Sequence, residues 1–495
     1  ERQADRRGRP SVRGETAVAW RARPGRVLRA ALGEAHAVAL VFAPPFAVAL
    51  AEGAWPLAAA LGAALVPPAV GALLARRYPV RRDLRQIEAV AVLVALFLGA
   101  SLLGAPAFVA LGLAPLDAVF ESVSGITSTG LTLAQGTMDW PLAGHVLRAW
   151  MQWCGGFAIA LAGVVLILGP GASRGAARAL GRASIGERDI LSSTRAQARA
   201  LLTAYGALTG VAVLAFLPLF PTWWEGVVLA LSAVSTGGFA PRPDSLASYS
   251  RAAQAAVMLA GLATAVSLLF YVRARRDGLR AAFLGTNAAA VTAATTGAAL
   301  LAAVLHLSLG GDAAGAADAL LNTLSAATTA GFSVAPVADG PPVLLAVVLV
   351  AMAVGGGAGS TAGGLKIERA LTYARIVRLA LLRLRVPPEA VLPLGRPGRP
   401  LPERRLVASV AVTVLYVVSA ALAWAAMLAG GVPALPALFD TISALSTVGL
   451  SAGAVDPALA APLKGVLIAA MLLGRLEFLA LIAVLSPATW APRHS

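Results

Sequence analysis

The sequence predicts an all-α polytopic membrane protein in which an N-terminal helical hairpin precedes four pseudo-repeated helix–pore-loop–helix units around a central pore. Three observations predict this fold class. The chain of 495 residues is 58% hydrophobic and only 13% charged, whereas a soluble domain carries about 25% charged residues. A short Ser/Thr/Gly motif occurs four times, and arginines gather in alternate loops between the apolar stretches.

The repeated motif has a constant internal spacing. Its copies read SGITSTGL, SAVSTGGF, SAATTAGF and SALSTVGL, and in each a glycine follows the first serine by six residues. The serine–glycine pairs are Ser124 and Gly130, Ser232 and Gly238, Ser325 and Gly331, and Ser443 and Gly449. A single small-residue stretch could serve close helix packing, but four copies with one offset indicate a structural unit used four times.

The chain before the first motif is expected to form two parts. Residues 1–30 are rich in arginine and contain no apolar span, which predicts a basic cytoplasmic arm. Two apolar stretches, 31–51 and 54–75, each have the roughly 20 residues that cross a bilayer core of ~30 Å. They predict an extra transmembrane hairpin over 31–77.

Each of the four pore units is expected to hold an outer helix, a short helix with its loop, and an inner helix. The units cover 86–173, 192–277, 280–378 and 402–486. Their outer and inner helices are expected at 88–113 and 145–170, 200–219 and 251–273, 281–308 and 341–375, and 406–429 and 460–485. The short segments are expected at 116–127, 223–235, 313–328 and 435–446. These segments are too short to span, so each should enter the membrane and return as a loop that lines a wet cavity.

The distribution of charge predicts the orientation. Arginines crowd the loops that join one unit to the next, and acidic residues are commoner in the opposite loops. By the positive-inside rule the arginine-rich side is cytoplasmic, as are both termini. Four cations on the opposite side depart from this pattern: Arg148, Arg242, Arg251 and Lys464.

The loop chemistry suits a dehydrated alkali cation. Backbone carbonyls and threonine hydroxyls can replace the water shell of an ion, and glycine adopts backbone angles that a residue with a Cβ resists. Three residues before each repeated serine the chain has Glu121, Leu229, Asn322 and Asp440. The two carboxylates in this set are expected to attract cations at the pore mouth.

Over residues 30–486 these motifs resemble the Trk/Ktr/HKT superfamily of potassium transporters, and the extra hairpin resembles its bacterial Trk branch. The resemblance implies potassium uptake through a gated, K⁺-selective pore, with K⁺ bound by the four loops as the transported ion. Glycine in all four loops goes with potassium preference in this superfamily. The implied filter residues are Thr127, Ser128, Thr129, Gly130, Ser235, Thr236, Gly237, Gly238, Thr328, Thr329, Ala330, Gly331, Ser446, Thr447, Val448 and Gly449.

Two further stretches are expected to form a gate. Six glycines fall within residues 355–364, and each costs about 1 kcal/mol relative to alanine in a helix, so the inner helix of the third unit should break there. An arginine inside an apolar span, Arg475, is functional by default, although a simple pair with Glu477 is the alternative. The resemblance implies an intramembrane loop that obstructs the pore and an arginine that faces it. The implied gate residues are Gly355, Gly356, Gly357, Gly359, Ser360, Thr361, Gly363, Gly364, Lys366 and Arg475.

Other functions remain open at this point. A proton- or sodium-coupled secondary transporter of another cation or solute also places its site at broken helices, but usually needs an intramembrane carboxylate. An enzyme is not expected, because the histidines are scattered along the chain at His36, His145, His306 and His494. No organic cofactor and no nucleic acid is expected.

The resemblance also implies an assembly and a location. It implies a homodimer in the bacterial inner membrane, with a cytosolic ring of nucleotide-binding, TrkA-like regulatory subunits. The arginine-rich cytoplasmic loops could bind that partner or anionic membrane lipids.

Overall fold

The computed structural model describes residues 22–77, 84–179, 194–387, 395–396, 399–400, 403–476 and 478–490. Helices make up most of this part of the chain, as predicted. The exceptions are loops and one small antiparallel pair of strands, β1 (Gly395–Arg396) and β2 (Arg399–Pro400). Residues 1–21 of the predicted arm lie outside the described residues, as do Arg81, Arg82, Arg182, Arg188 and Glu477.

A short helix precedes the N-terminal hairpin and begins within the predicted arm. Helix α1 (Pro24–Gly33) leads into α2 (Ala35–Glu52), which pairs with α3 (Trp55–Arg77). Proline suits the first helical position because its N–H would be unpaired there in any case, and residues 24–30 of the predicted arm are helical. Arg23 fixes this end by donating from Nε and Nη2 to the buried Glu88 carboxylate at 2.6 and 2.8 Å.

The helices of the four predicted units follow in chain order. The first holds α4 (Gln86–Ala110), α5 (Pro115–Ile126) and α6 (Leu142–Ala179). The second holds α7 (Thr194–Phe216), α8 (Trp223–Val234), α9 (Arg251–Ala265) and α10 (Leu268–Asp277). The third holds α11 (Leu279–Gly285), α12 (Ala288–Ser308), α13 (Ala313–Thr328), α14 (Pro342–Val354) and α15 (Ile367–Arg383). The fourth holds α16 (Glu403–Ala429), α17 (Ala434–Leu445), α18 (Ala461–Arg475) and α19 (Phe478–Leu485).

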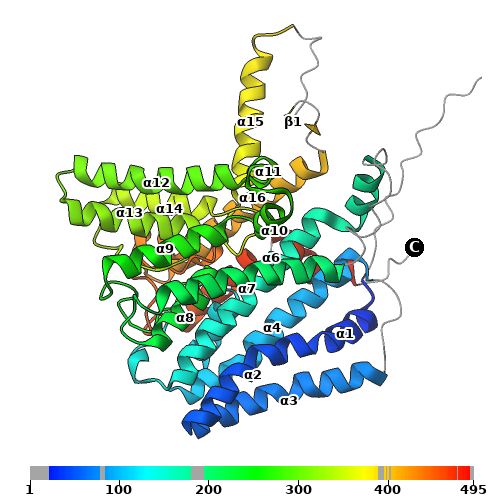
Figure 1. The fold of residues 1–495 in the computed structure, drawn as a ribbon, viewed down its shortest axis with the longest axis vertical. Coiled ribbons are helices and arrows are strands. Elements are labelled where there is room, and N and C mark those ends of the chain that lie inside the picture. Colours follow the sequence, from blue (N-terminus) through cyan, green and yellow to red (C-terminus); the bar gives the residue numbers. More distant parts are fainter. Residues whose placement is uncertain are drawn as a thin grey trace, which may run out of the picture.

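Among the described residues, six helices are long and apolar enough to cross a membrane, or eight if each of two bent pairs counts as one span. The chain is therefore a multi-pass membrane protein. Figure 1 shows the hairpin α2–α3 on one side of the molecule and α12, α13 and α14 on the other, while α15 projects from one end with β1 beside it. The short helices α5, α8, α13 and α17 lie within this body, and most of their C-terminal halves are buried.

The inner helices of three units are broken, although only one break was predicted. The predicted helix 251–273 is wrong as a single element, because α9 and α10 meet at an angle of 77°. The inner helix of the third unit breaks at the glycine run after α14, as expected. The predicted helix 460–485 also divides, since α18 ends at Arg475 and α19 begins at Phe478.

The break between α9 and α10 is held from outside its own unit. The glycine run of the third unit supplies the bonds that a continuous helix would have made. Gly357 N donates to Ala265 O at 2.9 Å, and Gly359 O accepts from Leu268 N at 3.0 Å. Backbone groups released at membrane depth must find such partners, so the two breaks stabilise each other.

The four cations that depart from the positive-inside pattern each have a carboxylate partner. The pairs are Arg148 with Glu121 at 2.9 Å, Arg242 with Glu225 at 3.2 Å, Lys464 with Asp117 at 2.5 Å, and Arg251 with Asp318. Each pair is formally neutral, so none of these four cations is an isolated charge.

Candidate functional site

The four short helices end in the same strained conformation. The residue four after each repeated serine has a left-handed backbone, with φ of 51° at Ser128, 51° at Thr236, 55° at Thr329 and 48° at Thr447. The next residue donates its N–H to the serine carbonyl in every unit, at 2.8–2.9 Å. Positive φ is uncommon for residues other than glycine, and such strain concentrates at functional sites. Its fourfold recurrence makes the four loops the candidate functional site.

The four glycines meet in a closed ring. A Cβ atom at Gly130, Gly331 or Gly449 would clash with a carbonyl oxygen of the neighbouring loop, and one at Gly238 would lie 3.0 Å from such an oxygen. In each case the oxygen belongs to the residue just before the glycine of the next unit. The oxygens belong to Gly237 beside Gly130, Ala330 beside Gly238, Val448 beside Gly331, and Thr129 beside Gly449. The order runs from the first unit to the fourth and returns to the first, so the loops surround one axis.

The constant serine-to-glycine spacing has a structural cause in two units. Ser124 Oγ accepts from Gly130 N at 3.0 Å, and Ser443 Oγ accepts from Gly449 N at 3.0 Å. In the third unit Ser325 Oγ has no hydrogen-bond partner among the described residues. The serine therefore fixes the glycine in the first and fourth loops but not in the third.

The second loop is held by a side chain that the sequence analysis did not identify. Gln152 of α6 accepts from Ser232 Oγ at 2.7 Å and from Phe239 N at 3.3 Å through Oε1. Its Nε2 donates to Gly237 O at 2.6 Å. A buried amide in an apolar helix was the only sequence signal. Because Gly237 O already has a donor, the ring is not fourfold symmetric in its hydrogen bonds.

Four of the implied filter residues have side-chain hydroxyls that form hydrogen bonds within the protein. Thr127, Ser235 and Thr328 donate to carbonyls three or four residues earlier in their own short helices, at 2.7, 2.9 and 2.8 Å. Ser446 Oγ bonds the Tyr416 hydroxyl at 2.7 Å. In these bonds the hydroxyls of the first three residues stabilise the ends of the helices that carry the loops.

The glycine loop between α14 and α15 lies directly against the ring residues. Gly363 N donates to Thr329 Oγ1 at 2.7 Å, and Gly364 N donates to Ser446 O at 3.1 Å. Thr361 Oγ1 accepts from Thr236 Oγ1 at 3.3 Å. The loop thus touches the second, third and fourth units at the inner end of their motifs.

The other residues expected to form a gate shape the loop itself. Its two ends meet, because a Cβ on Gly364 would lie only 2.8 Å from Gly355 Cα. Lys366 N donates to Val354 O and Ile367 N donates to Gly356 O, at 2.9 and 3.0 Å. Ser360 Oγ donates to Gly357 O at 2.5 Å inside the loop. These bonds close the run into a compact hairpin-like excursion from one broken helix.

Arg475 completes the contact with the first unit. Its side chain is buried, with a relative exposure of 2%. Nη1 donates to Thr361 O at 2.9 Å, and Nη2 donates to Ser128 Oγ at 3.3 Å. A cavity of about 30 Å³ lies beside these contacts and is lined by Gly363, Lys366 and Arg475 among others.

Comparison with known proteins places this arrangement in a family. The TrkH model, described as a cation transport protein, matches residues 101–270 and 302–489. This chain belongs to the TrkH family. The two matched segments contain all four loops, the glycine loop and Arg475.

Named members of the TrkH family cover most of the chain. The Trk system potassium uptake protein TrkH of Halomonas elongata is 30% identical over 480 residues, which is 91% of this chain and 96% of that protein. The protein of the same name from Escherichia coli K12 is 29% identical over 392 residues, 76% of this chain and 79% of that protein. The crystal structure of the potassium transporter TrkH from Vibrio parahaemolyticus has a TM-score of 0.83 at 24% identity and covers 95% of this chain and 100% of that one. The last comparison confirms the fold.

The acidic residues of this TrkH-family chain do not lie where the sequence analysis expected them. Glu121 and Asp440 are fully buried and bonded to neighbouring protein groups instead of facing a pore mouth. Glu225, in the first turn of α8, is also buried and accepts from the Tyr249 hydroxyl at 2.9 Å. Burial raises the pKa of Tyr249 and the Glu225 charge adds to the effect, so this phenol stays protonated and donates.

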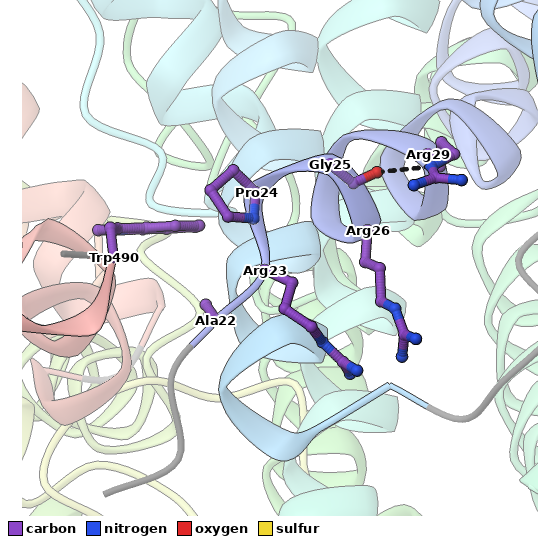
Figure 2. A pocket seen from close by; sticks show the side chains of 7 residues that line it. All are labelled: Ala22, Arg23, Pro24, Gly25, Arg26, Arg29 and Trp490. Atoms are coloured by element: carbon purple, nitrogen blue, oxygen red, sulfur yellow. Dashed lines mark hydrogen bonds between the residues drawn. The ribbon is translucent and has the colours of Figure 1, made fainter. Parts of the chain in front are cut away.

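A second pocket of this chain lies away from the ring. It has a volume of about 520 Å³ and is formed by the start of α1 and Trp490, with Arg23, Arg26 and Arg29 in its wall (Figure 2). Arg29 Nε donates to Gly25 O at 2.8 Å, as the dashed line in Figure 2 marks. No residue of the four loops lines this pocket.

Proposed function

We propose that this chain takes up potassium ions across a membrane through a pore whose narrowest part is the ring of four loops. One observation carries the proposal: the four glycines follow one another around a single axis in cyclic order. The cargo is supported by the relatives, which are named Trk system potassium uptake proteins.

The proposed filter uses backbone oxygens as ion ligands. Carbonyls that surround an axis can replace the hydration shell of K⁺, and the carbonyl before each glycine is one ligand in this proposal. Thr129, Ala330 and Val448 supply it in three loops, and Gly237 supplies it in the second while also bound by Gln152. The other filter residues in this proposal are those predicted from the sequence. The hydroxyls of Thr127, Ser235 and Thr328 stay hydrogen-bonded to carbonyls of their own short helices.

The proposed gate is the glycine loop with Arg475. The loop bonds to motif residues of three units, and Arg475 bridges it to Ser128 of the remaining unit. A loop in this position blocks an ion that leaves the ring toward the cytoplasm. Opening then requires that the bonds to Thr329, Ser446 and Thr236 break together.

The proposed setting is the inner membrane of a bacterium, with both termini in the cytoplasm. In this orientation α15 projects into the cytoplasm, where Figure 1 shows it standing away from the other helices. Its arginines suit a regulatory ring of nucleotide-binding, TrkA-like subunits, and the working unit is a homodimer.

The experiment is ion flux into liposomes that hold the purified protein. We expect uptake of K⁺ and Rb⁺ to exceed uptake of Na⁺ and Li⁺, with no requirement for a proton or sodium gradient. Equal flux of all four ions would contradict the filter. Uptake that stops when a proton or sodium gradient is collapsed would instead favour a coupled secondary transporter.

A further inference from the structure

Three of the short helices carry a polar side chain that reaches back to the chain leaving the ring. Glu121 Oε2 accepts from Leu133 N at 3.3 Å, Asn322 Oδ1 from Val334 N at 2.9 Å, and Asp440 Oδ1 from Ala452 N at 2.6 Å. The separation along the chain is 12 residues in each case. The donor is therefore always the third residue after the ring glycine.

The second unit breaks the pattern at both ends of the bond. The acceptor position is Leu229, which is fully buried among apolar side chains, and the donor position is Pro241. Proline has no backbone N–H, so an acceptor at 229 would have nothing to accept. The chain places a polar acceptor where a donor exists and an apolar residue where none does.

The outer part of the second loop is fastened through its carbonyls instead. Arg148 Nη1 donates to Ala240 O at 3.1 Å, and Thr137 Oγ1 donates to Pro241 O at 2.8 Å. Arg148 is itself paired with Glu121 at 2.9 Å. The acceptor of the first unit thus also orients the side chain that holds the second loop.

We infer that Glu121, Asn322 and Asp440 are positioning residues that fix the outer end of three filter loops, and that Leu229 with Pro241 is their matched apolar replacement. The inner end of each loop is already fixed by the serine carbonyl at the end of its short helix. A buried N–H without a partner is unfavourable, so the chain after the glycine has one preferred position. This inference rests on the proposed function, because ion selection is what the loop position controls.

Asp440 is the most heavily bonded of the three. Besides Ala452 N it accepts from Ser451 Oγ at 2.7 Å and from Ala454 N and Val455 N, both at 2.9 Å. Asn322 also donates from Nδ2 to Ala335 O at 3.0 Å. Asp440 and Asn322 therefore each bind a segment of the chain after the ring glycine and not a single N–H.

The test is a double-mutant cycle in the third unit that copies the second. Asn322→Leu leaves the Val334 N–H unpaired, Val334→Pro leaves Asn322 Oδ1 unpaired, and the double variant removes both. We expect each single change to lower the ratio of K⁺ flux to Na⁺ flux about five- to tenfold, the scale of one unpaired buried group. The double variant should recover most of the loss.

Two further variants separate positioning from general packing. Thr323→Val alters the next residue, which is equally buried and whose Oγ1 has no hydrogen-bond partner in the described part of the chain, so the flux ratio should not change. Asn322→Asp keeps the acceptor oxygen and should retain the ratio that Asn322→Leu loses. In the fourth unit Asp440→Asn and Asp440→Leu should differ in the same sense, with Thr441→Val as the control.

Amide hydrogen exchange gives a readout that does not depend on selective transport. Exchange across residues 332–337 should accelerate at least several-fold in Asn322→Leu but not in Thr323→Val. Equal exchange in these two variants, or a double variant no better than Asn322→Leu, overturns the inference. If the parent protein passes K⁺ and Na⁺ equally, the proposed function fails, while the exchange comparison still decides whether Asn322 positions the loop.

Discussion

At the scale of single residues, the ring depends on glycines that have no Cβ atom. Glycine is required at Gly130, Gly331 and Gly449 for two reasons: their φ values are positive, and a Cβ would clash with the next loop. These positions could be predicted from the sequence, because the motif recurs with a fixed offset. Gln152 could not, because it lies in a different helix from the loop it holds and no local pattern marks that contact.

Substitution of the ring glycines should have graded effects. In Gly130→Ser the new Cβ would clash with Gly237 O. In Gly238→Ser the new Cβ would lie 3.0 Å from Ala330 O, which is a milder contact. We expect Gly130→Ser to widen the ring and reduce the K⁺ over Na⁺ flux ratio strongly, and Gly238→Ser to reduce it less. Both also carry the cost of a left-handed residue, about 1–2 kcal/mol.

The control for the glycine series is Gly210→Ala in α7, where a Cβ would meet nothing within 4 Å. The K⁺ over Na⁺ flux ratio is measured in liposomes for all three variants. Retention of full selectivity in Gly130→Ser would show that the ring is not the selective element.

Arg475 should matter for closure and not for ion choice. Arg475→Gln shortens the side chain and removes its charge, which weakens the bonds to Thr361 O and Ser128 Oγ that tie the glycine loop to the first unit. We expect a several-fold rise in K⁺ flux without regulatory partners, with the K⁺ over Na⁺ ratio nearly unchanged. A rise in flux with complete loss of the ratio would mean that Arg475 supports the filter.

At the scale of elements, helix number and order follow from apolar length, but helix continuity does not. The glycine run predicted the break after α14, because glycine is a poor helix former. The break between α9 and α10 falls at Val266 and Ser267, with neither glycine nor proline there. It exists because the loop from another unit supplies partners to Ala265 O and Leu268 N, and a sequence read along one segment cannot display such a partner.

Removal of the glycine loop should raise basal flux. The ends of the loop lie side by side, because Leu365 N donates to Ala353 O at 2.9 Å and Gly364 approaches Gly355. Deletion of 356–363 can therefore be closed without stretching α14 or α15. We expect K⁺ flux to rise at least as much as in Arg475→Gln, measured in the same liposome assay.

Two comparisons limit the meaning of the deletion. Thr361→Val removes a hydroxyl that bonds Thr236 Oγ1 and the carbonyls of Val234 and Thr264, and it should raise flux slightly. Gly297→Ala, where a Cβ would have open space, should change nothing. Unchanged flux in the deletion would show that the loop is no gate.

At the scale of the whole molecule, ion pairs join neighbouring units on the side opposite the arginine-rich loops. Lys464 of the fourth unit pairs with Asp117 of the first, and Arg251 of the second pairs with Asp318 of the third. The ring closes only if the fourth unit meets the first. The Lys464–Asp117 pair lies at this contact, which we call the seam. These cations are exceptions in the sequence, because charge counting assigns a side of the membrane but no partner.

The seam pair should contribute more to stability than its counterpart. Lys464 and Asp117 side chains are 8% and 13% exposed, whereas Arg251 and Asp318 are 53% and 25% exposed. Loss of one partner of a buried pair leaves an uncompensated charge, so we expect Asp117→Asn to cost about 3 kcal/mol. Asp318→Asn should cost less than about 1 kcal/mol because water screens that pair.

Thermal unfolding of the purified protein in detergent measures the difference as a shift of midpoint temperature. The double variant Asp117→Leu with Lys464→Met removes both charges and should recover most of the stability lost in Asp117→Asn, since apolar replacement of a buried pair is often neutral. Equal shifts for Asp117→Asn and Asp318→Asn would contradict a special role for the seam. Failure of the double variant to recover would mean that Asp117 acts through contacts other than Lys464, so the closing of the ring would have to depend on the packing of α5 against α18.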